Sequence, residues 1–212
     1  MKASASRIQV YLDYINEIID LDEAIKRLTQ PSEPSEAMYI GTLIHGLLEK
    51  ITPQTLNDCD FVSIDKYTLA VNDCLKDVVK QTAVPHKLVE YKLSKEYPYK
   101  GDVITLSGIA DAIIGNNLIE YKTTSHIDIE RYYNSPQWKI YFDLFNPDRI
   151  EYHIMKLKVK ERQIEIVEYA QLNMYDYIGR SDEVRNTLYE FYDFVKSLGI
   201  ELYTNDSTTR NR

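Results

Sequence analysis

Hydrophobic residues in the first part of the chain recur at the spacing of an α-helix. Apolar side chains recur at helical spacing at Ile8, Tyr11, Ile15, Ile18 and Ile19, and the turn-forming run PSEPSE follows them. The pattern therefore predicts one N-terminal helix from residue 6 to about residue 28.

Two further helices are expected before the pattern changes. Ser35 can cap a helix that runs through AMYIGTLIHGLLEK, and Asp65 is expected to open another. The second of these carries one apolar stripe, made by Ala70, Val71, Cys74, Leu75, Val78 and Val79. Residues 1–84 are therefore expected to be mainly helical.

Alternating patterns rich in β-branched and aromatic residues take over beyond Pro85. Residues 87–99, 102–114 and 118–122 have this character, and short turns with Gly, Asn or Lys-Gly separate them. This order predicts a three-stranded antiparallel meander.

The last third of the chain returns to helices after one more pair of strands. Ser135 can cap, and Pro136 can begin, a helix through QWKIYFDLF. The segments IEYHIMKLKV and QIEIVEY have strand patterns, and apolar residues between 184 and 198 predict a helix that Gly199 terminates. The polar residues 204–212 are expected to form a frayed tail.

These elements predict a single α/β domain over residues 1–203. A central mixed β-sheet containing the antiparallel meander is expected to be flanked by helices. Residues 1–84 provide the helical N-terminal part, residues 85–170 the sheet with the candidate active site, and residues 173–199 the C-terminal helices.

The charge of the chain limits how it can bind nucleic acid. It has 33 Asp and Glu against 25 Lys and Arg, a formal net charge of -8 and a pI near 5.1. Proteins that hold nucleic acid by a bulk positive field usually carry a basic surface, so any DNA contact here must be local. A carboxylate-lined site remains compatible with DNA, because divalent cations bound there can receive phosphate oxygens.

Cysteine content and hydropathy exclude several other classes of protein. The two cysteines, Cys59 and Cys74, are too few for a four-thiolate metal or iron–sulfur site and form no disulfide framework. No run of about 18 apolar residues occurs, and the first residues lack the apolar stretch of a signal peptide. We expect a soluble, cytoplasmic protein without a membrane partner.

The candidate chemistry lies in the segment SGIADAIIGNNLIEYKTT. Glu120 and Lys122 share one face of a strand, and Asp111 joins that face if it pairs opposite Lys122 rather than Tyr121. That pairing needs an even loop, such as Asn116-Asn117 at the tip, although a bulge at the neighbouring glycine could shift it.

Clustered carboxylates holding Mg²⁺ or Mn²⁺, with a lysine beside them, are suited to phosphodiester hydrolysis. The lysine can orient the attacking water or stabilise developing negative charge. The same three side chains could instead form a solvated, ion-paired face. Their apolar neighbours favour a functional site, because buried unpaired charges are costly.

Four motifs in this order resemble the PD-(D/E)xK nuclease superfamily, in its branch of RecB-like, CRISPR-associated and phage exonucleases. GTLIHGLLE resembles the helix motif with His45, SGIADAI the G-x-x-D motif, IEYKTT the (D/E)-x-K motif and PQWKIY the Q-x-x-x-Y motif. The resemblance implies a restriction-endonuclease-like core.

The resemblance also implies roles for individual residues. Metal ligands would be His45, Asp111, Glu120 and the carbonyl of Tyr121, and the catalytic residues would be Asp111, Glu120 and Lys122. The implied cofactor is Mg²⁺ or Mn²⁺, and no iron–sulfur cluster is expected because its four cysteines are missing. Residues expected beside the lysine and the DNA are Gln137 and Tyr141.

Several other residues are weaker candidates. Glu49 lies one helical turn beyond His45, and Glu96 lies on the strand before that of Asp111, where an exposed glutamate is the commoner explanation. His126 follows the catalytic strand and could meet DNA. His86 and His153 are expected on turn or strand surfaces, and for these last three histidines a role other than metal ligand is favoured.

The leading hypothesis is a metal-dependent DNA exonuclease that acts in phage or bacterial recombination, repair or DNA processing. A structure-selective endonuclease or nickase, a nuclease-fold module that binds DNA or protein without activity, and a hydrolase of RNA or a small phosphoester remain alternatives. DNA is the expected partner, and a recombination partner protein is left open.

Overall fold

The computed structural model describes residues 1–57, 59–84 and 87–203. Its strands form one sheet in the order β1-β5-β6-β7-β8-β3-β2, and β4 pairs with β5. The strands are β1 (Lys2–Ser4), β2 (Phe61–Ile64), β3 (Tyr67–Ala70), β4 (Leu88–Tyr99), β5 (Asp102–Ile114), β6 (Asn117–Thr124), β7 (Arg149–Lys160) and β8 (Gln163–Met174).

The sheet is mixed, as expected. β4, β5 and β6 form the antiparallel meander, whereas β6 runs parallel to β7 and β1 runs parallel to β5. The helices are α1 (Ala5–Ile15), α2 (Leu21–Thr29), α3 (Glu36–Leu48), the 3₁₀ helix η1 (Pro53–Leu56), α4 (Asp73–Thr82), α5 (Ile129–Asn134), α6 (Pro136–Phe145) and α7 (Arg180–Leu198). The predicted α/β class, a central sheet flanked by helices, is confirmed.

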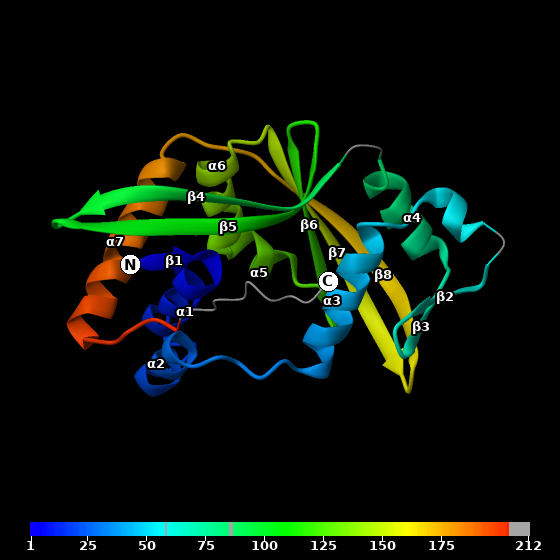
Figure 1. Cartoon of the computed structure of the whole chain (residues 1–212), viewed down its shortest axis with the longest axis horizontal. Helices are drawn as coiled ribbons and strands as arrows, with labels where there is room; N and C mark the ends of the chain where they lie inside the picture. The colour runs from blue at the N-terminus through cyan, green and yellow to red at the C-terminus, as the bar shows by residue number, and fades with distance from the viewer. Residues whose placement is uncertain (58, 85–86, 204–212) are drawn as a thin grey trace.

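Two hydrophobic cores lie on opposite faces of the central strands. The first joins the sheet to α1, α6 and α7, and the second joins it to α3, α4 and the β2–β3 hairpin. Along β6, Leu118 enters the first core while Ile119 and Tyr121 enter the second, as the two-residue period of a strand requires. Figure 1 shows α1, α6 and α7 on the left of the view and α3 and α4 on the right.

The strand β5 changes sides between the two cores. Ala110 is buried in the first core and Ala112 in the second, although two residues on one strand normally face the same way. The backbone ladder between β5 and β6 covers only Ala112 to Ile114, and β1 pairs with β5 farther along, from Thr105 to Ser107. Asp111 therefore stands where the sheet splits.

The prediction of a single N-terminal helix is wrong, because this segment forms two helices, α1 and α2. α1 ends at Ile15, Glu17 adopts a φ of 59°, and Asp20 accepts a hydrogen bond from the Glu23 amide to cap α2. A residue with positive φ and a new N-cap both interrupt helical hydrogen bonding. Ile18, on the expected apolar stripe, is 69% exposed.

The prediction of a helix that begins at Asp65 is also wrong, because the helix in this region begins eight residues later, at Asp73. Residues 61–70 form the β2–β3 hairpin, with Asp65 in its turn at a φ of 54°, and α4 begins only at Asp73, capped by Asn72. Strand pairing with β8 overrides the helical spacing of this segment. The mainly helical part over residues 1–84 thus contributes three strands to the sheet.

The C-terminal expectation needs a smaller correction. Residues 173–199 contain one helix, α7, which Gly199 ends at a φ of 61°, while β8 extends to Met174. The caps expected at Ser35 and Ser135 are confirmed. The tail over residues 204–212 lies outside the described residues, and no helix among the described ones is long and apolar enough to cross a membrane.

Candidate active site

The turn between β5 and β6 sets the register of the candidate site. Ile114 pairs with Asn117, so the two turn residues are Gly115 and Asn116, and Gly115 has a φ of 60°. Hairpins with a two-residue loop favour glycine at such a position, because it has no Cβ. The expected tip, one residue later, is therefore wrong.

The corrected register changes the residue that would face Asp111. The β5–β6 pairing ends at Ala112 opposite Ile119, and continuing the count by one residue places Asp111 level with Glu120 and not with Lys122. Glu120 and Lys122 share one side of β6, as the two-residue period requires, whereas Asp111 lies beyond the end of the pairing and its side is not set by parity. The predicted pairing of Asp111 with Lys122 is therefore wrong.

Glu120, Lys122 and Gln137 form a closed triangle of hydrogen bonds. The Lys122 ammonium donates to Glu120 Oε2 at 3.1 Å and to Gln137 Oε1 at 2.8 Å, and Gln137 Nε2 donates to the same Glu120 oxygen at 2.9 Å. Gln137 lies in the first turn of α6, which Ser135 caps. The start of α6 thus brings Gln137 within hydrogen-bonding distance of Lys122.

Tyr141 connects α6 to β5 one helical turn later. Its hydroxyl accepts a hydrogen bond from Gln137 Nε2 at 3.0 Å and donates one to the Ile109 carbonyl at 2.7 Å. A Cβ on Gly108 would lie 2.9 Å from a ring carbon of Tyr141 and 2.9 Å from Leu144 Cδ1. Glycine at this position therefore lets α6 approach the strand.

The Glu120 carboxylate is buried and only half satisfied. The residue is 2% exposed, and its second oxygen, Oε1, has no hydrogen-bond partner among the described residues. Burial raises the pKa of this carboxyl to about 7, with the Lys122 charge opposing the rise and the Asp111 charge adding to it. A buried carboxylate oxygen without a donor is costly unless a proton or a cation binds it.

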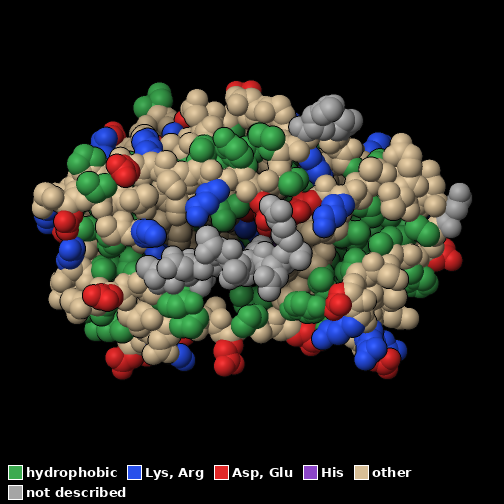
Figure 2. All heavy atoms as spheres, in the orientation of Figure 1, with side chains coloured by type: hydrophobic (Ala, Val, Ile, Leu, Met, Phe, Trp, Pro, Cys, Tyr) green, Lys and Arg blue, Asp and Glu red, His purple; other side chains and the backbone are tan. Residues whose placement is uncertain are grey.

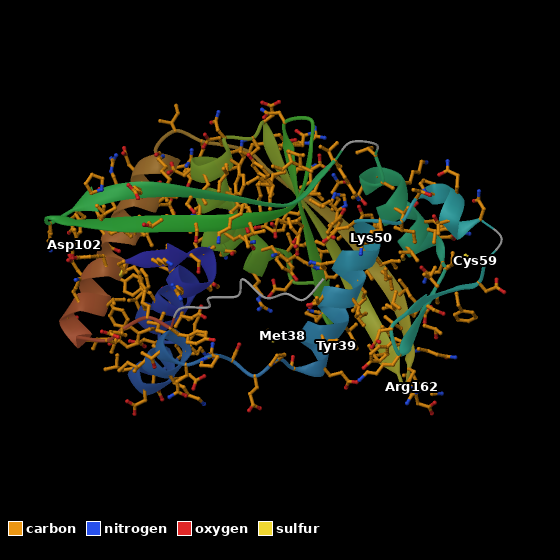
Figure 3. The ribbon with its side chains drawn as sticks, viewed as in Figure 1. Met38, Tyr39, Lys50, Cys59, Asp102 and Arg162 are labelled. Carbon is orange, nitrogen blue, oxygen red and sulfur yellow. The ribbon has the colours of Figure 1, made fainter. Side chains whose placement is uncertain are left out.

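Asp111 and His45 approach the same place from the other face of the sheet. Asp111 Oδ2 accepts the Tyr121 amide at 2.8 Å, which replaces the ladder bond lost where β5 and β6 separate, and Asp111 Oδ1 lies 3.6 Å from His45 Nδ1. His45 is on α3, which runs between Tyr39 and Lys50 in Figure 3. α3 comes close to β6 at Gly41, where a Cβ would lie 2.8 Å from the Thr123 hydroxyl.

The predicted metal ligands are near one another without forming a ready-made cage. Among the described residues, no group of three His, Cys, Asp or Glu side chains has the spacing of a metal site. The donor chemistry nevertheless fits a hard divalent ion, since carboxylate oxygens and one imidazole face the split in the sheet. The Tyr121 ring is fully buried in the second core, so only its backbone is left for the site.

Two glutamates add negative charge beside this group. Burial raises the pKa of Glu49, and the charges of Glu90 and Asp111 raise it further. Glu90 falls opposite Asp111 across the β4–β5 ladder and has a φ of 47°, unusual within a strand. Glu90 was not among the residues predicted from the sequence, although counting the register outward from the β4–β5 turn would have placed it there.

Other predicted residues lie away from the site. Glu96 is exposed opposite Thr105, and His126 is exposed beyond the end of β6. The expectation that His153 lies on a surface is wrong: it is fully buried, with Nδ1 2.7 Å from the Tyr169 hydroxyl, because the alternation along β7 turns it toward the second core. His86 lies outside the described residues.

Comparisons with known proteins bear on the fold. No protein-family model matches the chain, and no curated protein matches it. Among solved structures, SSO0001 has a TM-score of 0.52 at 15% identity, covering 96% of this chain and 79% of its own.

An alkaline exonuclease from Laribacter hongkongensis, LHK-Exo, has a TM-score of 0.52 at 14% identity, covering 93% of this chain and 89% of its own. LHK-Exo in complex with dAMP matches over the same shares of both chains, with a TM-score of 0.51 at 14% identity. The chain therefore shares the overall α/β fold of these structures, a mixed central sheet flanked by helices.

Proposed function

We propose that the chain is a divalent-metal-dependent deoxyribonuclease that hydrolyses DNA phosphodiester bonds as an exonuclease, in recombination, repair or DNA processing. The observation that carries the proposal is a buried Glu120 oxygen beside Asp111 that has no hydrogen-bond partner within the described part of the chain. A bound cation stabilises such a pair of carboxylates, whereas without a cation their burial is energetically unfavourable. The fold shared with an exonuclease that binds dAMP supports DNA as the substrate.

The residues that would hold the metal are His45, Asp111, Glu120 and the backbone carbonyl of Tyr121. A bound Mg²⁺ or Mn²⁺ would supply charge for the phosphate oxygens and would lower the pKa of a bound water. Oxygen-rich sites of this kind bind these hard ions in preference to soft metals, which favour thiolate ligands.

Lys122 is the residue best placed to act on the reacting phosphate. Its ammonium is held by Glu120 and Gln137 and is a quarter exposed, so it is both oriented and accessible. A fixed cation there stabilises the negative charge that develops during hydrolysis and orients the water. Tyr141 holds Gln137 in turn and is a positioning residue.

The test is digestion of end-labelled linear and covalently closed DNA, single- and double-stranded, with Mg²⁺, Mn²⁺ or EDTA. We expect metal-dependent loss of linear DNA by the wild type and none by Asp111→Ala, because that variant lacks a metal ligand. Asp182→Ala, which removes an exposed carboxylate on α7, is the matched control and should retain activity.

Each result leads to a different conclusion. Cutting of closed circles would make the protein an endonuclease, and equal cleavage by Asp111→Ala would contradict the proposed site. Absence of cleavage on every DNA would favour a DNA-binding module, or a hydrolase of RNA or small phosphoesters.

A further inference from the structure

The β4–β5 ribbon has one covered face and one uncovered face. On the covered side, Tyr97 hydrogen-bonds Asp143 of α6, and the Tyr91 ring lies 6.4 Å from that of Phe145. Gly108 is in close contact with α6 on the same side. Residues of the opposite parity on β5, up to Ile109, therefore point away from α6.

One apolar residue on this uncovered face lies next to the candidate active site. Ile109 is 49% exposed and is two residues from Asp111 on β5, a separation of about 7 Å along a strand. It pairs directly with Lys92 of β4, which is exposed and makes no ion pair within the described part of the chain. An apolar side chain and a cation thus stand together beside the predicted metal ligands.

The surroundings make this cation distinctive. The chain carries a net charge of -8, and the carboxylates of Glu90 and Asp111 lie close enough to Glu49 to raise the pKa of that buried glutamate further. Figure 2 shows acidic side chains gathered at the middle of the molecular face, with Lys or Arg side chains on either side. A phosphate next to the reacting one would be repelled by the carboxylates and attracted by Lys92.

We propose that Ile109 and Lys92 form a subsite for the nucleotide adjacent to the scissile phosphate of a DNA strand, and this rests on the proposed function. Ile109 contacts the base or sugar, and the Lys92 ammonium contacts the adjoining phosphate. Apolar contact with bases and cationic contact with the backbone are the two interactions by which single strands are bound without sequence preference. The subsite is a binding surface and takes no part in bond cleavage.

The test measures kcat and KM for metal-dependent cleavage of a linear single-stranded oligonucleotide. Ile109→Ser should raise KM about fivefold with kcat nearly unchanged, as for the loss of one apolar contact. Lys92→Gln should raise KM about threefold to tenfold and make KM less sensitive to salt, by about one unit of the log–log slope. Ile109→Val, which keeps an apolar side chain at this position, should have a KM close to that of the wild type.

Matched controls come from the same kinds of strand position. Val103 is 47% exposed on the same strand with the same parity but lies eight residues from Asp111, and Lys158 is an exposed lysine on β7. Val103→Ser and Lys158→Gln should leave KM unchanged.

The outcomes separate the subsite from the proposed function. Wild-type cleavage with an unchanged KM in Ile109→Ser and Lys92→Gln would overturn the subsite alone. A fall in kcat at unchanged KM would also overturn it, since that result would place the residues in the chemistry. Absence of cleavage by the wild type would overturn the proposed function and the subsite together.

Discussion

Glu120 is the residue of the candidate site whose negative charge is least favourable in the folded state. Its pKa is raised to about 7 because the carboxyl is buried, and one of its oxygens finds no donor in the ranges that the structure describes. Lys122 and Gln137 satisfy only the other oxygen. A residue that needs a proton or cation for a low-energy folded state is a sensitive probe of metal binding.

We predict that the metal-free protein loses stability as the pH rises. The folded-state pKa of Glu120, about 7, exceeds its ordinary value of 4.5, so the folded state binds a proton that the unfolded state does not bind between these values. The stabilisation of the folded state by this proton is complete below pH 4.5 and is lost as the pH rises through 7. The loss should be roughly 3 kcal/mol, measured as the free energy of unfolding in urea with EDTA.

Two variants make this prediction specific. Glu120→Gln should abolish the loss, while Glu165→Gln, which changes an exposed glutamate on β8, should retain it. Mg²⁺ added at high pH should stabilise the wild type and not Glu120→Gln. The same pH dependence in wild type and Glu120→Gln would show that another group is responsible.

At the scale of elements, α6 is the part that completes the site. Its first turn carries Gln137, and its end is held by Asp143, which accepts hydrogen bonds from Arg180 at 2.9 Å and from Lys95 at 2.8 Å. Between them, Tyr141 lies against Gly108 of β5. The distance between α6 and β5 therefore determines where Gln137 meets Lys122.

We predict that Gly108→Ala displaces α6 and lowers both stability and turnover. The added Cβ would lie 2.9 Å from the Tyr141 ring and from Leu144, an overpacking expected to cost about 1–3 kcal/mol. Urea denaturation and cleavage rates measure the two effects. In Gly46→Ala on α3, where a Cβ meets nothing within 4 Å, stability should rise by about 0.5–1 kcal/mol. Similar behaviour of the two variants would contradict this account of Gly108.

At the scale of the whole molecule, two cores meet along the central strands and the candidate site occupies the split between them. His45 and Asp111 reach it from the α3 side, and Gln137 reaches it from the α6 side. For the proposed DNA substrate, a chain with a net charge of -8 provides no bulk positive field. Binding must then depend on a small number of contacts near the site.

This organisation predicts a weak salt dependence of DNA binding. For Asp111→Ala and a labelled oligonucleotide, log Kd against log salt should give a slope of about one to three, the signature of a few phosphate contacts. Fluorescence anisotropy from low to physiological salt measures the slope. A slope near ten would instead require an extended cationic surface, contrary to the net charge of -8.

Much of the fold was predictable because short-range patterns agreed with the final packing. The meander, α6 after Ser135 and α7 up to Gly199 follow from alternation, capping residues and a terminal glycine. The errors fell where patterns conflicted with pairing. Residues 67–70 have helical spacing with those that follow them, but they pair with β2 and β8.

The sequence by itself determined which residues are proposed to carry the chemistry, since the acid, the acid-x-Lys pair and the glutamine are distinguishable by type and spacing alone. Tertiary structure decided the rest: that β5 and β6 separate just before Asp111, that one oxygen of Glu120 has no donor among the described residues, and that Glu90 joins the group. Register, burial and the switch of β5 between two cores depend on contacts between segments far apart in the chain. Local periodicity carries no information about such contacts.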